Sequence, residues 1–492
     1  MQDFLAIIAQ EGGMKLLSRI PSGVPGFDEV LHGGLIPGRL YLLSGGPGVG
    51  KTTLGLCFLR EGVRQGERAL CISLSEPVAN LVENATSLGI DVAGIDFLDL
   101  APTRDFFVQV ETYDLFSPAD VERVPTTRRI VESVTRVRPK RVFVDSLSQF
   151  RYLAPNPFEY RKQVLSFVRF LTECGATVLA TSEGSSEAPD ADLQFLADGV
   201  FFLFRTRYGR GIEVKKFRGS SFEPGVHALE LGAGGVRVFP YVVPLKERVE
   251  SSFERLSSGI PELDALCGGG IEEGTTTIIT GPTGVGKTTL AFQFAWGAAQ
   301  RGRRIAVYSF EEDVETILFR CEQVGIPAER MVRNGFLVVQ KIVPFQYSFQ
   351  SFGRKVIGEV FEREVLLVII DSIAGYKLSI LGQHLEGELY FLVKYLNAFG
   401  RTVFLINELE RVTGDFEITG RGLSYLADNI IFLRYLEIRG ELRKAIGILK
   451  KRLGDFEKRL REFSITEKGI VIGPPLGNLR GILLGVPEWV EE

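Results

Sequence analysis

The sequence predicts an α/β protein made of two tandem copies of one domain, each a mostly parallel sheet flanked by helices. Two observations lead to this prediction. Apolar runs of strand length alternate with longer helix-like stretches in both halves of the 492-residue chain, as in sheets whose parallel strands are joined by helical crossovers. In addition, RIPSGVPGFDEVLHGGLIPG from Arg19 recurs as RLSSGIPELDALCGGGIEEG from Arg255, which indicates that a whole domain is duplicated.

The repeat also sets the expected domain boundaries. We expect a first domain over 15–243, a polar, proline-flanked linker over 244–254, a second domain over 255–475 and a C-terminal tail over 476–492. The repeat begins just after Met14, which is therefore an alternative start to Met1.

The expected strands are short, nearly continuous apolar runs. In the first copy they are LYLLS, ALCISLS, RVFVD, TVLATS and GVFFLF, and in the second TTTIIT, IAVYSF, VLLVIID, TVFLIN and NIIFL. Such runs suit strands that are buried on both faces of a parallel sheet. Ligands of these sheets bind beyond the carboxyl ends of the strands, so candidate site residues are sought there.

Composition narrows the functional classes. A hydrophobic fraction of 45% supports packed cores. The 57 basic and 61 acidic residues nearly balance, and there is no long basic run, which argues against a nucleic-acid partner. The longest apolar runs fall short of the roughly 20 residues that span a membrane. We therefore expect a cytoplasmic protein without a membrane partner.

The cysteines and histidines carry no pattern of a metal site or a disulfide framework. The five cysteines are scattered, without CxxC spacing, and are expected to be buried thiols in a reducing compartment. The histidines His32, His227 and His384 are expected to be structural or exposed, because their spacing is not that of metal ligands.

A phosphate-binding loop occurs in each copy. GGPGVGKTT and GPTGVGKTT both follow a strand-like run and open a helix-like run, as the GxxxxGK-Ser/Thr motif requires. Glycines let backbone N–H groups converge on phosphate oxygens, the helix N-terminus favours negative charge, and the lysine reaches the β- and γ-phosphates. We therefore expect ATP as ligand. The expected nucleotide-binding residues are Gly45, Gly46, Pro47, Gly48, Val49, Gly50, Lys51, Thr52 and Thr53, and Gly281, Pro282, Thr283, Gly284, Val285, Gly286, Lys287, Thr288 and Thr289.

An aspartate ends one buried strand in each copy. Asp145 closes RVFVD and Asp371 closes VLLVIID. An acid at this place beside a phosphate loop is typical of the Walker B element, which holds Mg²⁺ directly or through water. With the loop hydroxyls of Thr52 and Thr288, these acids form the expected magnesium sites; the alternative is a solvated or helix-capping aspartate.

A second acidic position differs between the copies. The second copy reads SFEED, with Glu311 and Glu312, whereas the first reads SLSEP, with Ser75 and Glu76. A carboxylate at a strand end can orient a water or accept a hydroxyl proton. Glu76, Glu311 and Glu312 are thus the candidate catalytic residues, against the alternative of ordinary surface carboxylates. The two sites are expected to be chemically unequal.

A basic pair lies late in each copy. Lys216 and Arg218 stand in VKKFRGSS, and Lys450 and Arg452 stand in LKKRLGDF. Alternation along a strand puts the two members of a pair on one face. Because each pair is far from its own phosphate loop, it could act on the γ-phosphate of a neighbouring subunit. The alternative is a solvated, charged edge strand.

Together these segments resemble the KaiC family of circadian-clock ATPases and autokinases, within the RecA-like superfamily of P-loop NTPases. The resemblance runs from about Leu16 to the end of the chain. It is carried by the duplicated SGxxxxDxxxxGG segment, by SFEED, and by YLEIRGELRKAIGILKKR followed by REFSITEKG. It implies tandem RecA-like domains, a homohexameric double ring with Mg·ATP between subunits, and possible signalling or clock partner proteins. It also implies that the four basic residues act on the adjacent subunit's nucleotide.

The resemblance further implies a division of roles. The first domain would be an ATPase and assembly ring, and the second an ATPase that also phosphorylates its own hydroxyls. The family's phosphorylated Ser-Thr pair matches Ser424 and Tyr425 in GRGLSYLAD, and Thr419 matches a nearby threonine. Ser424 and Thr419 are thus the candidate phosphorylation sites, with a helix-cap or loop serine as the alternative for Ser424.

Several positions depart from the family pattern. Ser75 replaces the first acid of the first site, Tyr425 replaces a phosphorylated threonine, and Leu453 replaces the glycine after the second basic pair. Two other functions remain open on the sequence. One is a DNA-dependent RecA relative, for which RTRYGRG from Arg205 is the best candidate loop. The other is a nucleotide-gated scaffold without catalysis.

Overall fold

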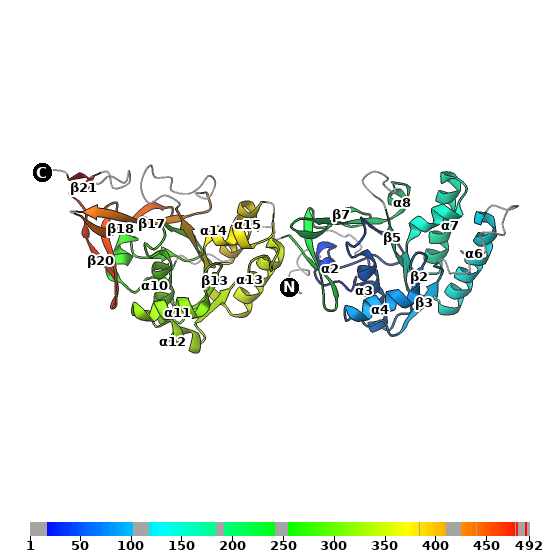
Figure 1. Ribbon diagram of the computed structural model, residues 1–492, viewed down its shortest axis with the longest axis horizontal. Helices are drawn as coiled ribbons and strands as arrows, with labels where there is room; N and C mark the ends of the chain where they lie inside the picture. The colour runs from blue at the N-terminus through cyan, green and yellow to red at the C-terminus, as the bar shows by residue number, and fades with distance from the viewer. Residues whose placement is uncertain are drawn as a thin grey trace. The chain divides into compact units, whose positions relative to one another are not determined.

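The computed structural model divides into two compact units, Met1–Tyr241 and Val242–Glu492. Each unit is a sheet with helices on both faces (Figure 1). The expected linker falls, apart from Glu254, outside the residues that the structure describes. The described residues are 17–101, 118–183, 191–241, 254–382, 384–409, 425–438, 440–477, 479–480 and 488–489.

The sheet of the first unit has the strand order β3-β2-β4-β5-β1-β6-β7-β8-β9. The strands from β3 to β6 pair in parallel, and β6 to β9 continue the sheet as an antiparallel meander. Strand bounds are β1 Leu40–Ser44, β2 Ala69–Ser73, β3 Ile95–Asp99, β4 Arg141–Asp145, β5 Thr177–Ser182, β6 Gly199–Thr206, β7 Gly209–Phe217, β8 Val226–Gly232 and β9 Gly235–Phe239.

Helices cover both faces of this sheet. One apolar cluster joins α2, α3 and α4 to one face, and a second joins α6, η2, α7 and α8 to the other. Helix α7 starts where the sequence signals a start, because the Asn156 side chain accepts a hydrogen bond from Glu159 N and Pro157 occupies the first turn. Helix bounds are α2 Phe27–Val30, α3 Lys51–Arg64, α4 Val78–Ser87, α6 Pro118–Val137, η2 Leu147–Leu153, α7 Pro157–Glu173 and α8 Ala191–Leu196.

The second unit repeats this sheet, in the order β14-β13-β15-β16-β12-β17-β18-β19-β20. Again the first six strands in this order pair in parallel and the rest are antiparallel. Bounds are β12 Thr276–Gly281, β13 Arg304–Ser309, β14 Leu337–Lys341, β15 Val365–Asp371, β16 Thr402–Glu408, β17 Asn429–Ile438, β18 Glu441–Lys451, β19 Arg461–Thr466 and β20 Gly469–Pro475. Short pairs are β10 Arg255–Leu256 with β11 Ile271–Glu272, and β21 Leu479–Arg480 with β22 Glu488–Trp489.

Its helices also lie on two faces. The cluster on one face includes residues of α9, α10, α11 and α12, and the cluster on the other includes residues of α13, α14 and α15. Bounds are α9 Pro261–Leu266, α10 Lys287–Gln300, α11 Val314–Gln323, α12 Ala328–Arg333, α13 Phe349–Glu362, α14 Ile373–Ser379 and α15 Leu385–Ala398.

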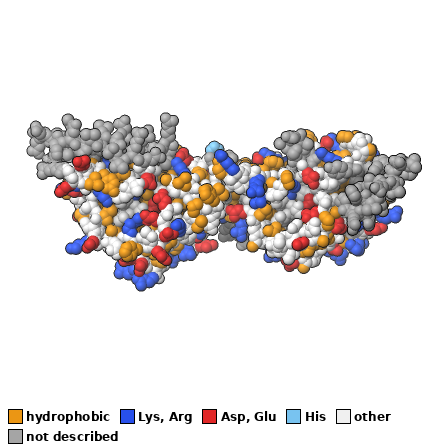
Figure 2. Space-filling view, in the orientation of Figure 1, with side chains coloured by type: hydrophobic (Ala, Val, Ile, Leu, Met, Phe, Trp, Pro, Cys, Tyr) orange, Lys and Arg blue, Asp and Glu red, His pale blue; other side chains and the backbone are white. Residues whose placement is uncertain are grey.

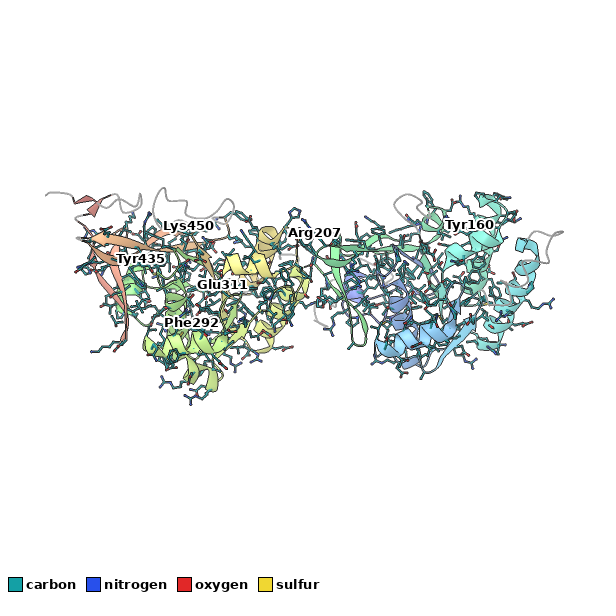
Figure 3. The ribbon with its side chains drawn as sticks, viewed as in Figure 1. Tyr160, Arg207, Phe292, Glu311, Tyr435 and Lys450 are labelled. Atoms are coloured by element: carbon teal, nitrogen blue, oxygen red, sulfur yellow. The ribbon has the colours of Figure 1, made fainter. Side chains whose placement is uncertain are left out.

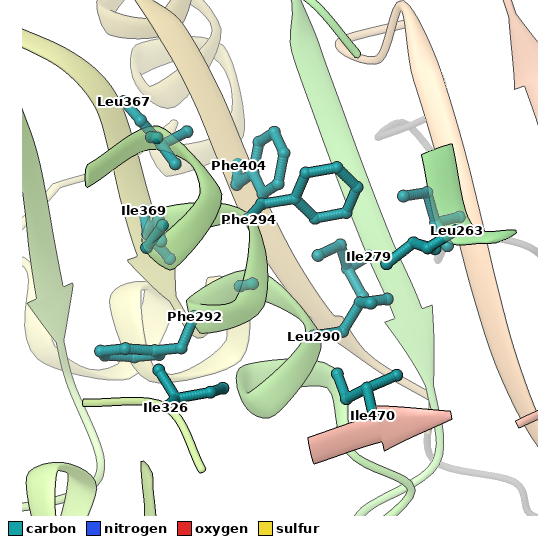
Figure 4. Close-up of a cluster of buried hydrophobic side chains, with 14 of the residues drawn as sticks. Leu263, Ile279, Leu290, Phe292, Phe294, Ile326, Leu367, Ile369, Phe404 and Ile470 are labelled. Carbon is teal, nitrogen blue, oxygen red and sulfur yellow. The ribbon is translucent and has the colours of Figure 1, made fainter. Parts of the chain in front are cut away.

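Packing fixes the helix that follows the phosphate loop. In the second unit, Phe292 and Phe294 of α10 are fully buried; Phe292 lies beside Ile326, and Phe294 points to the sheet (Figure 4). The ring of Phe294 meets that of Phe404 on β16 edge to face, with centroids 5.3 Å apart. A buried aromatic pair of this kind holds a helix firmly, so the loop at the start of α10 is set on a rigid element.

The expected fold class, duplication and strands are confirmed. One expectation about the cysteines is wrong: Cys57, Cys71, Cys267 and Cys321 are buried free thiols, but Cys174 is exposed because it caps the C-terminal end of α7. Of the histidines, His227 is buried, with Nε2 3.1 Å from the carbonyl oxygen of Glu223, and His384 is exposed. In the part of the chain that the structure describes, no helix is long and apolar enough to cross a membrane.

Candidate functional site

Both phosphate loops lie where the sequence predicts, between the central strand of each sheet and the following helix. The loop glycines meet real steric demands. A Cβ on Gly45 would lie 2.0 Å from the carbonyl oxygen of Leu203, and one on Gly281 would lie 2.5 Å from that of Leu433. Gly50 and Gly286 precede α3 and α10 with φ of 107° and 115°. Only glycine combines this close approach with a left-handed backbone.

Each loop lysine turns back over its own loop. Lys51 Nζ donates to the carbonyl oxygens of Gly45 and Gly46, both at 2.7 Å, and Lys287 Nζ donates to that of Pro282 at 2.8 Å. Burial lowers the pKa of both lysines, against the opposing effect of nearby carboxylates. These ammonium groups are therefore poised to exchange loop carbonyls for phosphate oxygens.

The hydroxyl after each lysine is paired with the aspartate at the end of the neighbouring strand. Thr52 Oγ1 donates to Asp145 Oδ2 at 2.7 Å, and Thr288 Oγ1 donates to Asp371 Oδ2 at 2.8 Å. In the first unit, Thr181 Oγ1 on β5 also donates to Asp145 Oδ1 at 2.5 Å. The sequence-predicted pairs are thus brought together in both units.

The donor set at these pairs fits magnesium. Each pair offers a hydroxyl and a carboxylate oxygen, and Mg²⁺ prefers one or two such protein ligands, with phosphate and water supplying the rest. In the described residues no group of three or more His, Cys, Asp or Glu side chains is placed to hold a metal. A cage made only of protein ligands is thus not found there, whereas a nucleotide-dependent site suits these atoms.

The second unit concentrates carboxylates around Asp371. The pKa of the Asp371 carboxyl is raised to about 6, chiefly by desolvation, with the charges of Glu312 and Glu311 adding to the rise and the hydrogen bond from Thr288 opposing it. Crowding of acids in this way costs free energy unless a cation is present. The cluster is therefore suited to receive Mg²⁺ and a developing positive charge, which is typical of a functional site.

The two glutamates after β13 have different partners. Glu311, labelled in Figure 3, accepts a hydrogen bond from Ser372 Oγ, directly after Asp371. Glu312 instead accepts from Arg320 NH1 of α11 at 2.6 Å. Glu311 is consequently held at the Walker B strand, while Glu312 is held toward the helix that follows.

In the first unit only the outer of these two carboxylates is present. Glu76, at the position of Glu312, accepts from Asn84 Nδ2 of α4 at 3.3 Å. Burial raises the pKa of Glu76, and the charge of Asp145 raises it further. Ser75, at the position of Glu311, is exposed, and its hydroxyl donates to the carbonyl oxygen of Asp145 at 3.4 Å.

Sequence reasoning missed one acid in each unit. Glu183 follows β5 and Glu408 ends β16, on the strand beside the one that leads to the phosphate loop. Burial lowers the pKa of both loop lysines; Glu183 opposes this shift at Lys51 together with Asp145, and Glu408 is the carboxylate that opposes it most at Lys287. The signal was available, since TVLATSE and TVFLINE end on glutamate at matching positions.

The basic pairs lie at the sheet edge opposite the phosphate loops. Because β7 and β18 run antiparallel to β6 and β17, Lys216 pairs with Val200 and Lys450 pairs with Ile430, at the amino ends of those parallel strands. Lys450, labelled in Figure 3, donates to the carbonyl oxygen of Ala427 at 2.7 Å.

The partners of the basic pairs come from their own units. Lys216 Nζ donates to the carbonyl oxygens of Gln194 and Phe195, at 2.9 and 3.1 Å. Arg218 and Arg452 lie 3.8 and 3.2 Å from Asp198 and Asp428. Each pair therefore contacts the segment that leads into β6 or β17 of its own unit.

The candidate phosphorylation residues Ser424 and Thr419 lie outside the described residues. Tyr425 is described, and its side chain is 51% exposed. Its ring packs against Tyr390 of α15, with centroids 5.5 Å apart. Tyr425 precedes β17 and so lies at the same sheet edge as Lys450. Leu453, which replaces a glycine of the family pattern, is 36% exposed.

Comparison with known proteins decides the family. The family model described as "ATPase: KaiC" matches this chain twice, over residues 20–242 and 256–477. The chain belongs to the KaiC ATPase family. Both matches span a phosphate loop, a Walker B aspartate and a basic pair, so the duplication seen in the sheets is a duplication of the KaiC domain.

Curated relatives in the KaiC family align over almost the whole chain. The circadian clock oscillator protein KaiC of Prochlorococcus marinus is 30% identical over 96% of this chain and 96% of its own. The protein of the same description from Parasynechococcus marenigrum is 29% identical over 96% and 94%. That from Thermostichus vulcanus is 28% identical over 96% and 92%.

Proposed function

We propose that this KaiC-family chain binds ATP at both phosphate loops, hydrolyses it at both, and in the second domain also transfers the γ-phosphoryl group to its own Ser424 or Thr419. The observation that carries this proposal is the position of Glu311. Its carboxylate is held by Ser372, next to the Thr288–Asp371 pair. A carboxylate there can accept the proton of an attacking hydroxyl or water.

The chain's own residues account for each part of the transfer. Lys287 and the loop N–H groups bind and orient the phosphates, and Thr288 and Asp371 would hold Mg²⁺, which neutralises phosphate charge when bound. The attacking oxygen forms a bond to the γ-phosphorus while the bond to the bridging oxygen breaks. ADP leaves with that electron pair, and the proton of the attacking oxygen passes to Glu311. When water attacks, the product is inorganic phosphate. When the hydroxyl of Ser424 attacks, the product is phosphoserine.

We further propose that a ring of identical subunits completes each site. Lys216 and Arg218, and Lys450 and Arg452, lie at the sheet edge opposite their own phosphate loops, as residues that serve a neighbour's nucleotide must. A cation on the transferred phosphoryl group stabilises the transition state. The hexameric number rests on the family resemblance alone, and a clock-type regulatory role is supported by the names of the relatives, which are circadian clock oscillator proteins.

The alternative of a nucleic-acid-dependent motor finds little support. The candidate loop RTRYGRG covers the end of β6, the turn and the start of β7. Arg207 of the turn, labelled in Figure 3, lies over the ring of Tyr208 at 4.6 Å. Arg210 from the start of β7 donates to the carbonyl oxygen of Gly48 at 3.4 Å, so this side chain supports the phosphate loop. On the face drawn in Figure 2, basic and acidic side chains are interspersed, unlike a continuous basic track.

One experiment separates these functions. The purified chain is incubated with Mg·ATP, its intact mass is measured, phosphopeptides are mapped, and released phosphate is counted with and without single-stranded DNA. We expect phosphate release that DNA does not stimulate, and a mass gain on Ser424 or Thr419 that Glu311→Gln abolishes. Phosphate release without any mass gain would show that the chain is an ATPase but not an autokinase. If neither phosphate release nor a mass gain is found, the chain is a scaffold without catalysis.

A further inference from the structure

The serine after each Walker B aspartate binds a carboxylate, but the carboxylate comes from a different strand in the two units. In the second unit Ser372 Oγ donates to Glu311, which follows β13. In the first unit Ser146 Oγ donates to Glu183 Oε1, which follows β5, at 3.4 Å. The serine hydroxyls at matching positions of the two units therefore bind different glutamates.

The exchange follows from the missing acid in the first unit. Ser75 occupies the position of Glu311 and carries no carboxylate. The remaining acid, Glu76, is bound to Asn84 of α4, just as Glu312 is bound to Arg320 of α11. Glu76 therefore contacts the following helix as Glu312 does. No carboxylate from this segment takes the place in the first site that Glu311 takes in the second.

Glu183 stands between the two strands that build the first site. Strand β5 pairs with β4, which ends at Asp145, and with β1, where Ser182 pairs with Ser44 just before the phosphate loop. Glu183 N donates to Ser148 Oγ at 3.0 Å, which fixes the backbone beneath the carboxylate. Two residues earlier, Thr181 binds Asp145. The end of β5 is thus tied to the Walker B strand on both sides of Glu183.

The charge of Glu183 also acts at the phosphate loop. Burial lowers the pKa of Lys51, and the carboxylates of Asp145 and Glu183 oppose this effect. Lys51 is the side chain that reaches the γ-phosphate. A carboxylate with electrostatic influence on Lys51 and a hydrogen bond from the residue after Asp145 therefore lies beside the place of phosphoryl transfer.

We propose that Glu183 is the carboxylate that orients and deprotonates the attacking water at the first nucleotide site, in place of the acid lost at Ser75. This role rests on the proposed hydrolysis of ATP at that site. The water oxygen forms a bond to the γ-phosphorus, and the bond between that phosphorus and the bridging oxygen breaks. ADP leaves with the electron pair, the water proton passes to Glu183 and then to solvent, and inorganic phosphate is released.

Glu408 provides an internal comparison. It occupies the matching place at the end of β16 and opposes the lowering of the Lys287 pKa, but in that unit Ser372 binds Glu311. With Glu311 present, the second site does not depend on Glu408 for its water. Glu183→Gln should therefore reduce turnover at the first site far more than Glu408→Gln reduces it at the second.

The test uses the full chain with Lys287→Ala, which leaves the first site as the source of turnover. Phosphate release at saturating Mg·ATP and the affinity for a fluorescent ATP analogue are measured with and without Glu183→Gln. We expect turnover to fall at least about 100-fold, the scale of a general base, while affinity changes less than about threefold. Glu159→Gln on α7, an acid whose charged partner is Lys162 of the same helix, is the matched control and should leave both unchanged.

A second variant distinguishes a chemical role from a structural one. Adding Ser75→Glu to Glu183→Gln restores a carboxylate at the position that matches Glu311. Turnover of this double variant should be at least about tenfold higher than that of Glu183→Gln alone. Turnover within about twofold of the parent after Glu183→Gln would overturn the role of Glu183 alone. No phosphate release from the Lys287→Ala protein with Glu183 intact would contradict hydrolysis at the first site itself, and the role of Glu183 with it.

Discussion

The hydroxyl of Ser372 donates a hydrogen bond to the carboxylate of Glu311. This contact fixes the inner acid of the second nucleotide site against the Walker B strand. In the first site the matching hydroxyl of Ser146 lies 3.4 Å from Glu183 instead. The duplicated domains thus share their phosphate loops and Thr–Asp pairs, and differ in the strand that supplies the acid.

Removing one loop lysine should remove one nucleotide. Lys51 and Lys287 each lie over their own loop and are the cations that reach the phosphates. Lys51→Ala or Lys287→Ala should therefore lower the bound nucleotide from two per chain to one at micromolar ATP, with affinity at the altered site reduced about 100-fold. Equilibrium binding measures this stoichiometry. Lys162→Ala on α7 is the control, and two nucleotides bound to either loop variant would contradict the assignment.

Gly45 should tolerate no side chain. Its φ is 145°, and a Cβ there would lie 2.0 Å from the carbonyl oxygen of Leu203, so Gly45→Ala must displace the loop or β6. We expect a loss of unfolding free energy of about 2–4 kcal/mol, typical of a backbone clash, and loss of nucleotide from the first site. Gly232→Ala is the matched control, because a Cβ there meets nothing within 4 Å. Equal stability of the two variants in urea would refute the steric argument.

The basic pairs should act between subunits. Lys450 lies at the sheet edge opposite Lys287's loop, so in a ring it can serve a neighbour. Lys450→Ala and Lys287→Ala proteins should each lose second-site turnover. Mixing them should restore part of it, because some interfaces then combine an intact Lys450 with an intact Lys287. Phosphate release from mixed and unmixed samples measures this, with Lys51→Ala in both to silence the first site. Lack of recovery in mixed rings would argue for a purely local role.

A buried carboxyl should make the second domain less stable as pH rises. Desolvation raises the pKa of Glu388 on α15 to about 7, and no hydrogen-bond partner of Oε2 is found among the described residues. Its folded-state pKa exceeds its unfolded value, so the unfolded chain ionises first. The free energy of unfolding should fall by up to about 3 kcal/mol between about pH 4.5 and 7, and then level off.

The matched variants isolate this effect. Glu388→Gln should remove that part of the pH dependence in urea unfolding curves. Glu386→Gln, whose partner is Lys377 at the surface, should retain it and shift stability by less than about 1 kcal/mol. Identical pH profiles for Glu388→Gln and the parent chain would show that the carboxyl is solvated in solution.

Much of the fold and of the nucleotide sites could be predicted from the sequence, because short local patterns specify them. Apolar strand runs, the GxxxxGK loops and the acids that end RVFVD and VLLVIID specify the parallel part of each sheet and bring Thr52 to Asp145. The meander formed by β8 and β9 has weaker signals, because exposed residues interrupt the short buried stretches of both strands and β9 is the edge strand of the sheet.

The acids of the sites were harder to predict. Glu183 follows β5 and Glu408 ends β16, and each of these strands is distant in the chain from the strand that it pairs with before the phosphate loop. The relation of these acids to Lys51 and Lys287 therefore depends on strand order. The exposure of Cys174 likewise depends on where α7 ends. The basic pairs were found by sequence, but their contacts with the turns before β6 and β17 depend on antiparallel register.

The most direct test of two working but unequal sites is phosphate release by two single-site proteins, Lys287→Ala and Lys51→Ala, each with its acids altered in turn. We predict that Glu183→Gln stops the first site and that Glu311→Gln stops the second, while each exchange spares the other site. Turnover that depends on Glu311 alone, with no release from the Lys287→Ala protein, would contradict this account.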